Sequence, residues 1–146
     1  MRRTTLALIL AALAATPAMA EQTASPDGAG VYFVDLEDGA TVSSPVTVRF
    51  GLRGMGVAPA GTEKAMTGHH HLLIDRPAFG EGADGADEFI YAVPADDNHR
   101  HFGGGQTEVE VELAPGEHTL QLVLGDHNHI PHDPPVTSEV ITITVE

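Results

Sequence analysis

The stretch TEVEVELAPGEHTLQLVLGD, residues 107–126, indicates the fold class of this chain most clearly. A glutamate and an apolar residue alternate from Glu108 to Leu113. Alternation with a period of two is typical of a strand with one buried face and one solvated face. A second β-type run, HTLQLVLGD, follows the Pro-Gly turn, so the stretch predicts two successive strands.

Runs of the same kind are spread over the rest of the chain. They are VYFVDL (31–36), VTVRFGL (46–52), HHLLID (70–75), EFIYAV (88–93) and EVITITV (139–145). Gly and Pro turns separate these runs, and no segment has a clear helical period. The pattern predicts an all-β chain, folded as an immunoglobulin-like antiparallel β-sandwich of about seven strands.

The first 20 residues have the features of a secretory signal peptide. A basic start is followed by the apolar run LALILAALAA and by the cleavage site AMA, which ends at Ala20. Because the apolar run is too short to span a bilayer, we predict an exported periplasmic chain without membrane insertion. Residues 21–30 are expected to form a flexible leader, and residues 31–146 a single β-sandwich domain.

Charge and cysteine content narrow the function further. Without residues 1–20, five Lys and Arg face 21 Asp and Glu, a side-chain balance of −16. Such a surface repels nucleic acid and attracts cations, although solubility alone explains the charge equally well. The absence of cysteine excludes disulfides, thiolate ligands and thiol catalysis. The acidic segment 76–87 lacks the spacing of a calcium loop, so we expect a solvated loop there.

Eight of the nine histidines fall in three clusters. They are His69, His70 and His71; His99 and His101; and His127, His129 and His132. Each cluster contains His-x-His, a spacing that places two side chains on one face of an extended strand, about 6.6 Å apart. Since the loops of a sandwich gather at its two ends, distant clusters can converge on one ion. We therefore predict a surface metal site.

The spacing also ranks the candidate ligands. The pairs 69/71, 99/101 and 127/129 are the candidate first ligands, with His70 and His132 in reserve. Imidazole binds copper, zinc, nickel and iron(II), and Cu(II) binds more tightly than Zn(II) at a given nitrogen site. Copper is therefore the predicted ion, with zinc as the alternative. Met55 and Met66 are alternative thioether ligands, although packing is the commoner role of such residues.

The histidine motifs also carry a resemblance. TGHHHLLID, NHRHFGGGQTE and PGEHTLQLVLGDHNHIPHDPPV, with DGATVSSPVTVRFGLRGMGVAPAG before them, resemble a family of exported bacterial domains of unknown function over residues 31–145. The resemblance implies that the three motifs belong to one recurring design. The chain is more loosely similar to copper-zinc superoxide dismutase in its His-x-His strand, but it lacks the disulfide cysteines of that enzyme.

Three functions stay open at this point. The first is a periplasmic protein that holds copper on clustered histidines for buffering, resistance or delivery, with a copper donor or acceptor protein as its partner. The second is a metal-dependent enzyme, for example a redox enzyme of the superoxide dismutase kind, although the sequence contains no nucleophile signature. The third is an interaction domain without metal, whose histidines respond to pH.

Overall fold

A computed structural model describes residues 22–146, so the predicted signal peptide lies outside the described residues. The elements, in chain order, are β1 Gly30–Val34, β2 Thr41–Val42, β3 Val46–Arg53, β4 Gly56–Val57, β5 Thr67–Ile74, the 3-10 turn η1 Asp87–Phe89, β6 His99–His101, β7 Glu108–Val111, β8 Gly116–Gly125 and β9 Ile141–Val145. Within the described part of the chain, no helix has the length and apolarity that a membrane crossing needs.

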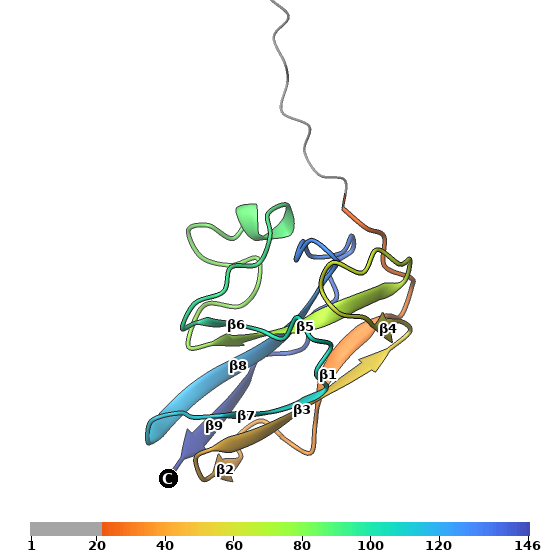
Figure 1. The fold of residues 1–146 in the computed structure, drawn as a ribbon. Helices are drawn as coiled ribbons and strands as arrows, with labels where there is room; N and C mark the ends of the chain where they lie inside the picture. Colours follow the sequence, from red (N-terminus) through yellow and green to blue (C-terminus); the bar gives the residue numbers. More distant parts are fainter. Residues whose placement is uncertain (1–21) are drawn as a thin grey trace, which may run out of the picture.

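The strands form two sheets that pack against each other (Figure 1). The smaller sheet has the order β1-β3-β7 and is antiparallel throughout. The larger sheet has the order β2-β9-β8-β5-β4, with β6 also paired to β5. Its long pairs are antiparallel, and only the two-residue strands β2 and β4 pair in parallel. The predicted all-β sandwich is confirmed.

The stretch 107–126 joins the two sheets. β7 pairs with β3 in the smaller sheet, whereas β8 pairs with β5 and β9 in the larger one. The Pro-Gly turn therefore carries the chain from one layer to the other and does not close a hairpin. Both strands predicted from this stretch are present, and Val111 at the end of β7 is buried.

The prediction of a strand at 88–93 is wrong. This segment begins within η1, where the amides of Ile90 and Tyr91 both donate to the carbonyl of Asp87, and it continues without regular structure. Phe89 packs edge-on against Phe79, with ring centroids 5.1 Å apart. In segment 88–93, apolar packing therefore stabilises a turn and not a strand. Three strands were not predicted, β2, β4 and β6, because two or three residues are too few to show a period.

The apolar core lies between the sheets. Val48 and Phe50 of β3 face Leu72, Leu122 and other buried residues of the larger sheet. Burial of each such side chain stabilises the fold by about 1.5–3 kcal/mol relative to exposure. The even-numbered residues of β5 and β8 supply this face, because successive side chains of a strand point to opposite sides.

The larger sheet is buried on its outer face as well, which is why β5 from Gly68 onward and the second half of β8 are buried at every position. Two segments cover this face, one between β5 and β6 and one between β8 and β9; they lie side by side in Figure 1. Gln121 on β8 links both, since its side chain accepts from the amide of Phe79 (2.8 Å) and donates to the carbonyl of Ser138 (3.0 Å).

The structure also differs from the expected flexible leader at 21–30. The amide of Asp133 donates to the carbonyl of Thr23, and the amide of Ser25 donates to the carbonyl of Asp133, both at 3.0 Å. The side chain of Gln22 donates to the carbonyl of Pro131 at 3.1 Å. Residues 22–25 are therefore part of the folded unit and cover the segment after β8.

Candidate metal centre

Four histidines meet on the outer face of the larger sheet. His69 and His71 lie two residues apart on β5 and share this face. His101 on the edge strand β6 is the pairing partner of His71. His129 lies in the loop after β8, and the last residue of β8, Gly125, is the pairing partner of His69. Strand register thus brings the four side chains together.

The four rings lie close to one another. Ring centroids of all pairs are 4.6–5.9 Å apart. His69 Nε2 lies 3.0 Å from His129 Nδ1 and 3.1 Å from His71 Nε2, and one ring nitrogen of each residue lies within 4.8 Å of the others. With metal–nitrogen bonds of ~2.0–2.1 Å, adjacent ligands are ~2.9 Å apart in a square plane and ~3.4 Å apart in a tetrahedron. The cluster is therefore close enough to hold one metal ion.

Burial favours the uncharged form of three of these rings, His69, His71 and His101. It lowers the pKa of His71 to about 2 and that of His69 to about 4, and repulsion from the neighbouring rings adds to both shifts. The pKa of His101 is also lowered, by burial and then by His129. A neutral imidazole is the form that binds metal, so an ion entering near pH 7 displaces no proton from the two buried rings.

The buried rings carry polar atoms that the protein does not satisfy. His69 Nδ1 and His71 Nδ1 are buried and have no hydrogen-bond partner among residues 22–146. In addition, His69 Nε2 faces two other ring nitrogens, and one proton can serve only one of these contacts. Unsatisfied buried polar groups cost about 1–3 kcal/mol each. A cation bound at the facing nitrogens would satisfy His69 Nε2 and His71 Nε2, which favours a metal site, and would leave the two Nδ1 atoms without a partner.

The loop 126–130 holds His129 through Asp126. One carboxylate oxygen of Asp126 accepts from the amides of Asn128 (2.8 Å) and Ile130 (3.0 Å), and its carbonyl accepts from the amide of His129 (3.0 Å). His129 takes a left-handed backbone conformation in this turn, with φ of 66°. Asp126 is 2% exposed, and it is the only carboxylate that is fully buried in the described part of the chain. Its charge acts to raise the pKa of His69, against the larger effect of burial.

Two glycines leave room for the rings. A Cβ atom on Gly125 would lie 2.7 Å from His71 Nε2, and one on Gly103 would lie 2.6 Å from His101 Nε2. Gly125 was not among the predicted site residues, although a glycine that ends an apolar strand just before a histidine motif is a usable indication of close packing. In the glycine run 103–105, Gly103 accepts a hydrogen bond from the amide of Ala60 at 2.9 Å.

Two candidate ligands of the sequence analysis point away from the cluster. His70 faces the core, where its ring lies 5.0 Å from that of Phe50, and burial lowers its pKa to about 4. His99 contacts Arg76 Nη1 at 2.8 Å and the carboxylate of Asp96 at 2.7 Å. The structure thus shows which residues of β5 face the outer side of the sheet. His69 and His71 face the cluster, and His70 faces the core.

The other two candidates lie near the cluster but outside it. His127 contacts the side chain of Asn128 at 2.9 Å, and the buried ring of His132 contacts Thr23 Oγ1 at 2.8 Å. Met55 packs against the apolar core, and Met66 is exposed. Four of the eight candidate histidines therefore form the cluster.

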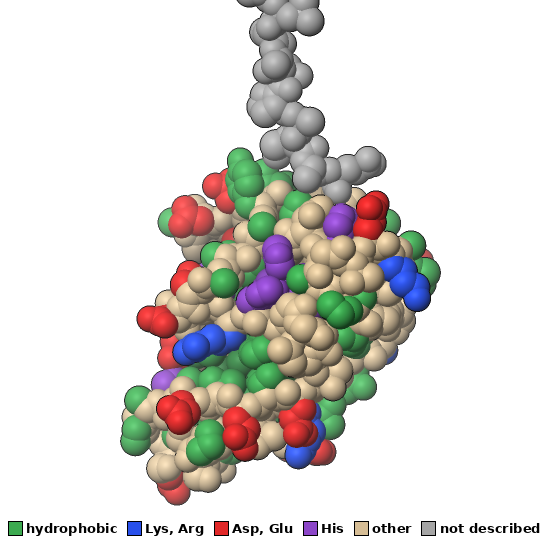
Figure 2. All heavy atoms as spheres, viewed as in Figure 1, with side chains coloured by type: hydrophobic (Ala, Val, Ile, Leu, Met, Phe, Trp, Pro, Cys, Tyr) green, Lys and Arg blue, Asp and Glu red, His purple; other side chains and the backbone are tan. Residues whose placement is uncertain are grey.

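The cluster is more deeply set than the predicted surface site. His69 and His71 are fully buried, His129 is partly buried and His101 is exposed. Figure 2 shows histidine side chains at the surface in the middle of one face of the molecule. The exposed ring of His101 connects the buried pair to solvent.

Comparison with known proteins assigns the part of the chain that contains this site to a family. A family model described as "Domain of unknown function (DUF4399)" matches residues 48–146. The chain belongs to this family. The match begins inside β3, so it includes all four clustered histidines and Asp126, and it confirms the predicted resemblance over a shorter range than 31–145. Neither the search of curated proteins nor that of solved structures finds a match.

Proposed function

We propose that this protein binds one copper ion, as Cu(II), and that it buffers or delivers copper in a bacterial periplasm. The ligands are one ring nitrogen each from His69, His71, His101 and His129. The proposal is carried by the convergence of these four nitrogens within 4.8 Å of one another, two of them on fully buried rings. An exported, acidic chain with such a site attracts cations and holds one in a fixed position.

The donor set supports copper over zinc. All four donors are imidazole nitrogens, and at such a site Cu(II) binds more tightly than Zn(II). The two shortest separations, 3.0 and 3.1 Å, are hydrogen-bond contacts at His69 Nε2 that either ion could replace, so the preference for copper comes from the all-imidazole donor set.

Calorimetric titration of the metal-free protein with Cu(II) and Zn(II), each against a competing chelator, tests the choice of ion. We expect one equivalent of Cu(II) to bind at least tenfold more tightly than Zn(II). His71→Ala should abolish tight binding, whereas His118→Ala should not, because His118 bonds to Asp75 and lies outside the cluster. Affinities weaker than about 1 µM for both ions, or equal losses in the two variants, would remove the proposal.

The cellular location needs its own test. Fractionation of bacteria that express the full chain should place the protein in the periplasmic fraction. Mass spectrometry should then give a first residue of Glu21, as expected for cleavage after Ala20. An uncut chain in the cytoplasmic fraction would contradict a periplasmic role and would leave the metal site itself unaffected.

A further inference from the structure

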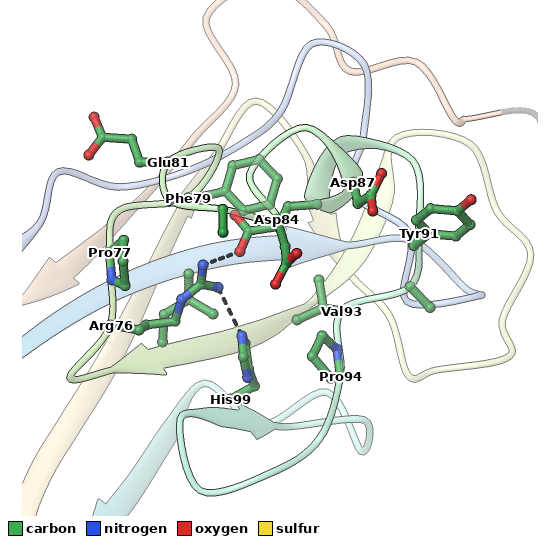
Figure 3. Close-up of a pocket in the computed structure, with 15 residues that line it drawn as sticks. Arg76, Pro77, Phe79, Glu81, Asp84, Asp87, Tyr91, Val93, Pro94 and His99 are labelled. Carbon is green, nitrogen blue, oxygen red and sulfur yellow. Dashed lines mark hydrogen bonds and ion pairs between the residues drawn. The ribbon is translucent and has the colours of Figure 1, made fainter.

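A cavity of about 350 Å³ lies beside the histidine cluster, beneath the segment between β5 and β6 (Figure 3). Leu73 of β5 and His99 of β6 line it, each two residues away from a clustered histidine on the same strand. Its opposite wall includes Val93, whose amide donates to the carbonyl of His129 at 2.9 Å. A volume of this size is in the range of small-molecule sites, roughly 300–1,000 Å³.

The segment that covers the cavity is mostly exposed, as expected for a solvated loop at 76–87, but side-chain contacts fix it to the sheet. The side chain of Arg76 pairs with that of Glu88, and both are largely buried. The second carboxylate oxygen of Glu88 accepts from the amide of Gly80 at 2.6 Å. Arg76 also reaches His99, as the second dashed line in Figure 3 shows. These contacts hold the segment 76–88 over the sheet.

Most charged side chains around the cavity are negative. Arg76 is its only Lys or Arg, and the pairing with Glu88 neutralises it. Glu81, Asp84 and Asp87 also line the cavity; all three are exposed, and their carboxylates have no ion pair or hydrogen bond among residues 22–146. The remaining lining is largely apolar, with Phe79, Val93 and the ring of Tyr91 among it. The cavity thus combines apolar walls with the exposed carboxylates of Asp84 and Asp87, whereas the carboxylate of Glu81 points away from it (Figure 3).

We propose that this cavity binds a small organic cation, namely an ammonium group carried on an apolar body. The apolar body would pack against Phe79 and Val93, and the ammonium group would lie near Asp84 and Asp87. Tyr91, which is half exposed, offers a ring face to the same cation. The site is separate from the metal ligands, so the proposal does not depend on the proposed copper function.

Three probes of nearly equal size separate charge from shape in a direct test. The probes are 4-phenylbutylammonium, 4-phenylbutanol and 4-phenylbutyrate, titrated into the metal-free full chain at 150 mM salt and followed by amide chemical shifts. We expect the ammonium to bind at least tenfold more tightly than the alcohol, and the carboxylate to bind most weakly. The shifted amides should lie in 73–94 and at 99. Equal affinities for the three probes, or shifts confined to other segments, would overturn the proposal.

Matched variants distinguish probe binding by the cavity carboxylates from attraction by the net charge of the protein. Asp84→Asn with Asp87→Asn should weaken ammonium binding about tenfold and leave alcohol binding unchanged. Glu110→Gln with Glu112→Gln removes the same charge outside the cavity and should leave both unchanged. Ala92→Trp, at an exposed lining residue, should fill the cavity and abolish binding of all probes without lowering the melting temperature. Equal weakening by the two double variants would mean that the net charge attracts the probe, and would also overturn the proposal.

Discussion

Gly125 and Asp126 are neighbours at the end of β8, and they support the four histidines in different ways. Gly125 has no side chain where the ring of His71 approaches its backbone. Asp126 holds the turn that carries His129 and places a buried negative charge near His69. Neither residue is a predicted ligand, yet both should affect metal binding, because one controls space and the other controls charge.

Gly125→Ala should disrupt the metal site more than the fold. The new Cβ atom would lie 2.7 Å from His71 Nε2, so the ring must move out of its position. We expect Cu(II) affinity to fall at least 100-fold and stability to fall by about 1–3 kcal/mol, as is usual for overpacking. Gly56→Ala is the control, because its Cβ atom meets nothing closer than 3.5 Å. Unchanged affinity in Gly125→Ala would show that His71 is not a ligand.

Asp126→Asn should change the charge of the site and preserve its shape. The amide oxygen of asparagine can still accept from Asn128 and Ile130, so the turn should persist. Loss of a negative charge penalises a doubly charged ion more than a singly charged one. We expect Cu(II) affinity to fall about tenfold and Cu(I) affinity to fall less, so the reduction potential of the bound copper should rise. Equal losses for both oxidation states would indicate a purely structural role.

His70 should make the stability of the metal-free protein depend on pH. Its pKa is about 4 in the folded chain and about 6.5 in the unfolded chain, so the unfolded chain takes up the proton first as the pH falls. Its contribution to the free energy of unfolding is therefore complete above pH 6.5 and is lost between pH 6.5 and 4. At about 1.36 kcal/mol per pH unit, the loss at pH 5 is at most about 2 kcal/mol.

Denaturant unfolding at pH 7.5 and pH 5 measures this contribution. His70→Leu keeps an apolar side chain against Phe50 and removes the titrating group, so the difference between the two pH values should shrink. His69, His71, His101 and His132 have lowered pKa values as well and contribute to the remaining difference, and the raised pKa of His118 acts against them. An identical difference in His70→Leu and the parent would contradict a buried neutral His70.

At the scale of elements, the edge strand β6 carries two histidines with different roles. His101 pairs with His71 and joins the cluster, whereas His99 pairs with Leu73 and contacts Arg76. His101→Ala should weaken Cu(II) binding at least tenfold, because it removes one of four ligands. His99→Ala on the same strand should leave Cu(II) affinity within about twofold. Competition titrations measure both, and the opposite ranking would show that β6 presents its other histidine to the metal.

The same scale shows where sequence patterns stop being informative. Alternation predicted β3 and β7 well, because their periods extend over at least four residues, whereas β5 and β8 were predicted as apolar β-type runs between turns. It could not predict β6, which is three residues long and flanked by turns. For β5 it left the facing of the three histidines open, because the strand is buried on both sides and shows no polar face.

At the scale of the whole molecule, the sequence predicted the sandwich and the presence of a histidine site but not its members. Three His-x-His clusters indicated the site, and the selection of four residues depends on the β5–β6 register and on the turn of Asp126. Both are long-range features that local spacing does not encode. The folded position of residues 22–25 depends likewise on backbone contacts with the segment near Asp133. Small polar residues at a terminus carry no pattern that would reveal such contacts.

A crystal structure of the copper-loaded protein, with anomalous scattering recorded at the copper edge, tests the central claim most directly. We predict one strong anomalous peak about 2.0–2.1 Å from a ring nitrogen of each of His69, His71, His101 and His129. No anomalous peak should lie beside any of the other five histidines. A peak at His99, His127 or His132, or four separate weak peaks at the surface, would contradict the four-histidine site.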